Sequence, residues 1–219
     1  MSDHLTVDVV DTDVAFREAL DESSQETRAG FLQKALVAGG VIAAGGVVLG
    51  GLPKLVTAAP SPSQDIQILN FALLLEYLEA EFYAEALRNG ALSGETRSFA
   101  QVTGAHEQAH VAFLRKALGS RARSKPTFDF KDTTRDQAKF QATAVLLEDT
   151  GVAAYNGQAQ NLTKKTLAAA ATIVSVEGRH AAWIRDIIAQ NPAPNAFDPL
   201  KTRAQIEAAV GQTGFIKAS

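Results

Sequence analysis

The sequence predicts an all-α protein: a bundle of four long helices with a long crossover between the second and third, followed by a short C-terminal helix. Four segments repeat apolar residues at helical spacing and are bounded by glycine or proline. Short connections join the first two segments and the last two, whereas the middle connection is long. No alternating run or hairpin turn typical of β-structure occurs in the sequence after residue 58.

Residues 1–58 are predicted to be an acidic leader followed by an export signal. The segment Thr27–Lys34 (TRAGFLQK) precedes an uncharged, glycine-rich stretch over residues 35–53. This arrangement resembles a twin-arginine translocation signal, although Arg28 stands there without a second arginine. We therefore expect export to the periplasm or cell envelope. The alternatives are the general secretory route, a membrane anchor formed by residues 35–53, and a cytosolic protein.

Glycines delimit the first two helices. Residues 65–89 contain neither proline nor glycine, and this helix is expected to end before Gly90. The next helix is expected over residues 93–118 and ends before Gly119. Residues 119–133 lack helical periodicity, so we expect them to form an extended crossover.

The third and fourth helices form a second pair. The third is expected over residues 134–161, with Thr134 as its N-cap. Two internal glycines weaken this helix without ending it. The fourth is expected to follow Thr163 as its cap and to continue until Pro192.

The connection lengths predict how the helices are arranged. The short connections make each pair an antiparallel hairpin. An extended crossover of about fifteen residues can span about 50 Å, which exceeds the length of about 38 Å of a 25-residue helix. The third helix can therefore start at the far end of the bundle. We expect the bundle over residues 59–190, and a C-terminal tail over residues 191–219 with a short helix near 203–210.

Two helices carry the motif Glu-x-x-His, as Glu107–His110 and Glu177–His180. Residues three apart lie on one face of a helix, so each motif can direct a carboxylate and an imidazole to one point. In each hairpin, the number of residues to the turn brings a glutamate of the other helix, Glu76 or Glu148, level with the motif. The predicted metal-ligating residues are Glu76, Glu107, His110, Glu148, Glu177 and His180.

This set of donors suits two divalent metal ions. Four carboxylates carry four negative charges, so a buried layer with two neutral imidazoles is charge-balanced only when two such ions are bound. Oxygen-rich ligands with one histidine per ion suit iron or manganese. The alternative is that these side chains lie on solvated helix surfaces, which would need no matching of heights across four helices.

The composition excludes several other kinds of function. The chain has no cysteine, which excludes disulfides, cysteine-bound zinc and thiolate-held iron–sulfur clusters. Residues 59–219 hold 16 acidic and 17 basic residues. This near-neutral balance argues against a nucleic-acid partner.

Residues 65–190 resemble the ferritin-like superfamily, whose dinuclear site takes one Glu from each of two helices and Glu-x-x-His from the other two. The export signal, the segment Leu75–Tyr83 (LEYLEAEFY) and the C-terminal tail are together similar to exported bacterial ferritin-like domain proteins related to desiccation-associated proteins. The resemblance implies two iron or two manganese ions as cofactors. No haem is expected, because bacterioferritin binds haem through methionine and the only methionine here is Met1.

Several residues near the predicted ligands need separate interpretation. Tyr83 and Tyr155 are expected to hydrogen-bond the ligands of the opposite half and are candidates for carrying electrons. Glu79 is either an extra ligand or an interhelical or solvated glutamate. His106 stands where many relatives carry an Asp that holds an imidazole of the other half, and we expect it at the rim of the site. The equivalent position before the second motif is Val176.

Two functions fit these observations. The first is an exported redox protein that consumes peroxide or oxygen, or oxidises ferrous iron, at a dinuclear iron or manganese site. Peroxide disproportionation needs no external reductant, which fits a chain without a cysteine-bound electron donor. The second is a non-catalytic envelope protein whose site sequesters metal or supports the fold during desiccation or stress. The expected partners are metal ions and peroxide or oxygen, with a homo-oligomer left open and membrane contact only if the signal stays uncleaved.

Overall fold

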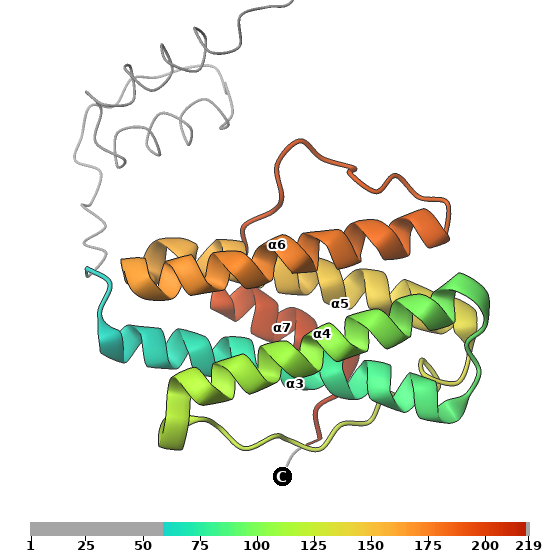
Figure 1. Cartoon of the computed structure of the whole chain (residues 1–219), viewed down its shortest axis with the longest axis horizontal. Helices are drawn as coiled ribbons and strands as arrows, with labels where there is room; N and C mark the ends of the chain where they lie inside the picture. The colour runs from blue at the N-terminus through green and yellow to red at the C-terminus, as the bar shows by residue number, and fades with distance from the viewer. Residues whose placement is uncertain (1–58, 218–219) are drawn as a thin grey trace, which may run out of the picture. The chain divides into compact units, whose positions relative to one another are not determined.

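The computed structural model describes residues 59–217 and has the all-α architecture that the sequence predicts (Figure 1). Its helices are α3 (Pro62–Asn89), α4 (Gly94–Leu118), α5 (Gln137–Gln158), α6 (Lys164–Ile187) and α7 (Arg203–Thr213), with short 3₁₀ turns at Gly119–Arg121 and Ala159–Asn161. The predicted leader over residues 1–58 lies outside the described residues. Within the described part, no helix is both long and apolar enough to cross a membrane.

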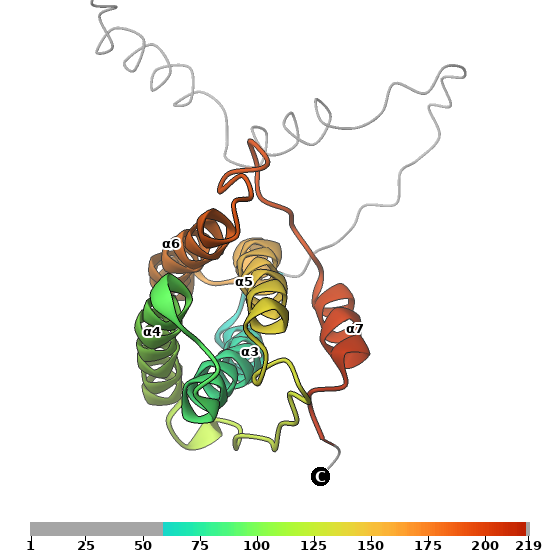
Figure 2. The same ribbon diagram turned by 90° about the vertical axis from the view of Figure 1, so that its right-hand side faces the viewer.

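Four of the helices form a bundle of two antiparallel hairpins. α3 packs along α4, and α5 packs along α6. The crossover between α4 and α5 runs along the bundle from one end to the other (Figure 1). Seen end-on, the four helices surround a common interior, and α7 lies outside them beside α5 (Figure 2). The predicted fold class, a four-helix bundle with a long crossover and a short C-terminal helix, is confirmed.

The first hairpin has the predicted boundaries to within one helical turn. Ser61 caps α3 by accepting a hydrogen bond from the backbone N–H of Gln64, and Pro62 occupies the first helical position. Gly90 ends α3 in the left-handed region, with a φ of 72°. Glycine adopts this φ without the steric cost that a side chain would add.

The third helix begins three residues later than predicted. Asp136, rather than Thr134, caps α5, because its carboxylate accepts a hydrogen bond from the backbone N–H of Lys139 at 2.8 Å. The Thr134 hydroxyl is buried and donates instead to Glu85 at 2.6 Å, which ties the crossover to α3. A polar side chain that has a partner elsewhere in the fold is not available as a cap.

Asp65, in the first turn of α3, holds the start of α6. Its carboxylate accepts hydrogen bonds from the backbone N–H of Thr163 at 2.9 Å and from the hydroxyls of Thr163 and Thr166. Thr163 therefore precedes α6 as predicted, but its hydroxyl binds Asp65 and makes no capping bond to the helix. α6 ends at Ile187, ahead of the predicted end at Pro192, and the chain leaves the helix through Ala189, whose φ is 56°.

We expect Asp65→Ala to lower the free energy of unfolding by about 2 kcal/mol, because it leaves a backbone N–H and two hydroxyls without their acceptor. Urea denaturation of the variant and the unchanged protein measures the difference. Gln67→Ala, an exposed substitution on the same helix, is the control and should change the free energy by less than about 0.5 kcal/mol. Equal losses in the two variants would contradict the role of Asp65.

Two apolar clusters fill the bundle and leave a polar layer between them. On α4, Phe99 belongs to one cluster and Leu114 to the other. On α6, Ile184 belongs to the same cluster as Phe99, and Ile173 belongs to the same cluster as Leu114. The turns that carry the two Glu-x-x-His motifs therefore lie between apolar walls. Such walls exclude water and strengthen electrostatic interactions within the layer.

Candidate metal centre

The structure brings all six predicted metal-ligating residues together in this polar layer. α3 and α5 each supply one glutamate, and α4 and α6 each supply a glutamate and a histidine. The four glutamates are at most 1% exposed. The residues are Glu76 of α3, Glu107 and His110 of α4, Glu148 of α5, and Glu177 and His180 of α6. That they bind metal stays a prediction.

The donor atoms fall into two groups that share two carboxylates. In each group, one donor atom from every residue lies within 4.8 Å of the others. The first group is Glu76, Glu107, His110 and Glu177, and the second is Glu107, Glu148, Glu177 and His180. Glu107 and Glu177 belong to both groups, whereas each remaining glutamate is paired with one histidine. The division follows the internal symmetry of the two hairpins.

Both imidazoles direct Nδ1 into the layer. The Nδ1 atom of His110 lies 3.0 Å from Glu107 Oε2, 3.2 Å from Glu76 Oε2 and 3.3 Å from Glu177 Oε1. The Nδ1 atom of His180 lies 3.1 Å from Glu107 Oε1 and 3.2 Å from Glu148 Oε2. One ring nitrogen surrounded by two or three carboxylate oxygens is the environment of a cation, either a proton or a metal ion.

Two tyrosines hold the carboxylates that are not shared. The Tyr83 hydroxyl, from α3, donates to Glu148 on α5. The Tyr155 hydroxyl, from α5, donates to Glu76 on α3. Burial, followed by the charge of the accepting glutamate, raises the pKa of each tyrosine well above its usual value. Both hydroxyls therefore stay protonated and act as donors that fix the orientation of the unshared glutamates.

Without metal, the surroundings raise the pKa of three groups in the layer. Burial and then the negative charge of neighbouring carboxylates raise the pKa of Glu107 and of Glu177. Burial lowers the pKa of His110, but its close contacts with the carboxylates of Glu107, Glu177 and Glu76 outweigh it and raise this pKa to about 12. These shifts favour the protonated forms of the shared carboxylates and of His110 when no metal ion provides positive charge.

Unpaired buried atoms show that the layer fits a cation better than a hydrogen-bond network. Within the described residues, Glu107 Oε1, Glu148 Oε2 and His180 Nδ1 are buried and make no hydrogen bond, although His180 Nδ1 lies 3.1 Å from the first of these oxygens and 3.2 Å from the second. Both carboxylate oxygens of Glu177 are also buried and make no hydrogen bond, although Oε1 lies 3.3 Å from His110 Nδ1. Leaving such atoms unpaired is costly, and a bound ion would satisfy them together.

A family model described as a ferritin-like domain matches residues 64–190, which is more than half of the chain. The chain belongs to the ferritin-like family. A search of the curated proteins finds no match to the sequence. The matched range contains all six residues of the candidate metal centre. The narrower likeness to exported, desiccation-associated relatives rests on the sequence alone and stays a prediction.

Glu79 is a fifth buried carboxylate in the polar layer of this ferritin-like bundle. It is 2% exposed, so it is interhelical rather than solvated, and its Oε2 atom makes no hydrogen bond within the described residues. It belongs to neither donor group. Burial and then the charge of Glu177 raise its pKa well above the usual value, so it is held as a neutral acid. A neutral Glu79 leaves the charge balance of the six predicted ligands unchanged.

His106 lies at the solvent-exposed rim, as expected, and contacts one of the two site histidines. Its Nδ1 atom lies 2.9 Å from Nε2 of His180, and the two rings are stacked with centroids 5.2 Å apart. The neighbouring His110 side chain is 12% exposed, compared with 3% for His180. The side of the layer formed by α4 and α6 is therefore the side nearest to solvent.

Gly151, on α5, is a site residue that the sequence analysis missed. A Cβ atom at this position would lie 2.6 Å from Glu177 Oε2 and 3.4 Å from Glu79 Oε1. Only a residue without a side chain lets the shared carboxylate of Glu177 approach α5 this closely. The available signal was a glycine inside a helical pattern, three residues after Glu148.

We expect Gly151→Ala to weaken metal binding by about 10- to 100-fold, a loss typical when groups that orient a metal ligand are disturbed. The fold should survive, because alanine is the better helix former. Gly178→Ala is the matched control: Gly178 follows Glu177 on α6, and a Cβ there would meet nothing within 4 Å. Isothermal titration calorimetry measures the metal affinity of the two variants. Equal affinities would contradict the role given to Gly151.

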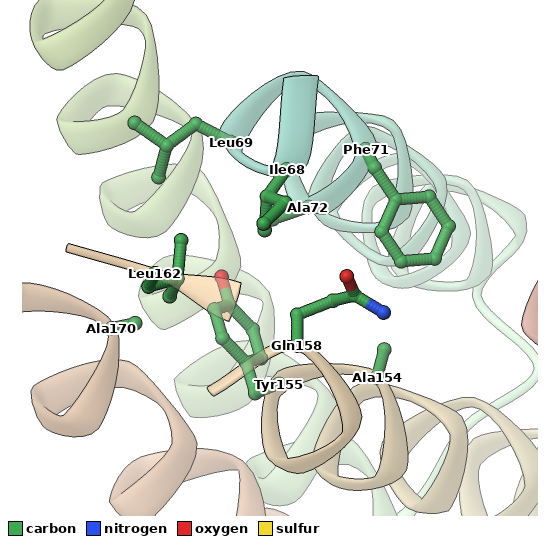
Figure 3. Close-up of a pocket in the computed structure, with 9 residues that line it drawn as sticks. All are labelled: Ile68, Leu69, Phe71, Ala72, Ala154, Tyr155, Gln158, Leu162 and Ala170. Carbon is green, nitrogen blue, oxygen red and sulfur yellow. The ribbon is translucent and has the colours of Figure 1, made fainter. Parts of the chain in front are cut away.

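A small apolar cavity of about 10 Å³ adjoins the site at Tyr155 (Figure 3). Its wall is formed by α3, α5, α6 and Leu162. Tyr155 and Gln158 are the only polar side chains among the described residues that line it. A cavity of this size has room for about one water molecule and lacks the donor set of a second metal site.

Proposed function

We propose that this protein binds two iron or two manganese ions between its four bundle helices. Glu76 with His110 would hold one ion, Glu148 with His180 would hold the other, and Glu107 and Glu177 would bridge them. The observation that carries this proposal is the pair of donor groups that share two carboxylates. The balance between four carboxylates and two divalent ions supports it further.

We further propose a redox function that consumes peroxide or oxygen or oxidises ferrous iron. When bound, the ions supply the electron transfer, since no described side chain provides a thiolate donor. The chain's own residues provide the surroundings: the apolar clusters exclude water, and Tyr83 and Tyr155 orient the unshared glutamates. Disproportionation of peroxide is the simplest variant, because one peroxide is oxidised to oxygen while a second is reduced to water without an external reductant.

Metal content and peroxide consumption together test this function. The full chain is loaded with ferrous iron or with manganese(II), freed of excess metal, and analysed for metal per chain. We expect two ions per chain and evolution of oxygen from peroxide with at least one of the two metals. Two bound ions without turnover of peroxide, oxygen or ferrous iron would refute the redox proposal and leave metal sequestration or protection of the fold as the function.

Export is part of the proposal and is supported by the sequence of residues 1–58. A fusion of these residues to a reporter that is active only outside the cytoplasm tests it. We expect export of the fusion, and loss of export when the Arg28 to Lys34 segment is deleted. A reporter that remains in the cytoplasm would contradict this part.

A further inference from the structure

The two halves of the candidate metal centre differ in one contact. His106 immediately precedes the Glu-x-x-His motif of α4, and its Nδ1 atom lies 2.9 Å from Nε2 of His180 on α6. The equivalent position before the motif of α6 is Val176, which has no hydrogen-bonding side chain. No hydrogen bond to Nε2 of His110 occurs within residues 59–217. The internal symmetry of the hairpins is therefore broken at this position.

With a metal ion at Nδ1, the contact would give the hydrogen at Nε2 of His180 an acceptor. Since Nδ1 faces Glu107 and Glu148, a metal ion would use the lone pair of Nδ1. The hydrogen of the neutral, metal-bound ring would then reside on Nε2, from which it would be donated to Nδ1 of His106. Such a partner holds the ring in its metal-binding tautomer and orientation.

His110 has no such partner at Nε2 within residues 59–217, although its Nδ1 atom contacts Glu107 and Glu76. Its ring is also more exposed, at 12% compared with 3% for His180. An ion on this side would therefore bind a ring that the protein holds at Nδ1 and not at Nε2. Within residues 59–217, the half with Glu148 and His180 is the one whose ring has a partner at Nε2.

We propose that His106 is a positioning residue that makes the two metal positions unequal, so that the first ion binds between Glu148 and His180. This inference rests on the proposed function, because it requires that the layer bind metal. It adds that the two positions fill in order, and that the order is set by a residue that is not itself a ligand.

Manganese(II) is the probe. The full chain is titrated by calorimetry, which gives two dissociation constants, and crystals grown with one equivalent of manganese locate the first ion by anomalous diffraction. We expect the two constants to differ by about 10-fold or more, the usual effect of such partners on metal affinity. The first ion should appear at the Glu148 and His180 position.

Three variants separate positioning from a general structural effect. His106→Leu removes the acceptor and should reduce the ratio of the two constants by about 10-fold. His106→Asn should keep it, because the Asn Oδ1 atom occupies the place of the histidine Nδ1. Gln108→Leu, an equally exposed polar-to-apolar change on α4, is the control and should leave the ratio unchanged.

The outcomes distinguish this inference from the proposed function. If the unchanged protein binds no manganese in the layer, the proposed function fails and the inference fails with it. Two ions bound with equal affinity, or first occupancy beside His110, would overturn the inference alone. An unchanged ratio in His106→Leu, or a loss in His106→Asn as large as that in His106→Leu, would also overturn it.

Discussion

Glu177→Ala is expected to lose binding of both metal ions, whereas His110→Ala is expected to retain about one ion per chain. Glu177 belongs to both donor groups, so its removal takes a ligand from each position. His110 belongs to one group only. His110→Ala should also lose turnover of peroxide, because chemistry that moves two electrons between paired ions needs both of them.

Metal analysis of the two variants, purified side by side with a peroxide assay, measures this difference. Glu79→Gln is the control, because Glu79 is buried in the same layer but belongs to neither donor group. Gln keeps the shape of a neutral glutamic acid, so this variant should bind two ions. Two ions in Glu177→Ala would contradict a shared carboxylate, and full turnover in His110→Ala would contradict a dinuclear mechanism.

Removal of metal should lower the melting temperature, and the loss should grow as the pH rises. Glu107 and Glu177 have raised pKa values in the metal-free fold, so they bind protons more tightly there than in the unfolded chain. A carboxyl group of this kind contributes stability below its unfolded pKa, and the contribution is lost as the pH rises. The pKa of His110 is raised to about 12 in the fold, compared with about 6.5 in the unfolded chain. Its contribution to stability is therefore also lost as the pH rises above about 6.5.

Metal ions replace these protons, so the metal-bound protein should gain stability between about pH 5 and pH 8 while the metal-free protein loses it. With free metal at about 1,000 times its dissociation constant, binding stabilises by about 4 kcal/mol. For a chain of this size the melting temperature should differ by about 10 °C near pH 8. Calorimetric melting at pH 5.5 and pH 8, with and without a chelator, measures both differences. A difference that shrinks as the pH rises, or none at pH 8, would contradict a buried site.

The fold and the convergence of the six residues could be predicted because both depend on counting along helices. The distance of Glu76 from its turn equals that of Glu107 to within one residue, so any antiparallel hairpin brings them level. The same count applies to Glu148 and Glu177. Helical periodicity and loop length, the strongest signals in a single sequence, were sufficient for this step.

Features that depend on a neighbouring helix could not be predicted from the sequence alone. Thr134 and Asp136 are both competent caps, and only the packing of the crossover on Glu85 decides between them. The space at Gly151 depends on how closely α5 approaches Glu177. The contact of His106 with His180 likewise requires the spacing of α4 and α6, which periodicity does not specify.

Anomalous diffraction from crystals of the fully metal-loaded protein tests the central claim most directly. Data collected at the absorption edge of iron or manganese locate each ion and identify its ligands. The account predicts two ions, one beside Glu76 and His110 and the other beside Glu148 and His180, with Glu107 and Glu177 bound to both. A single ion, or two ions that do not share Glu107 and Glu177, would contradict it.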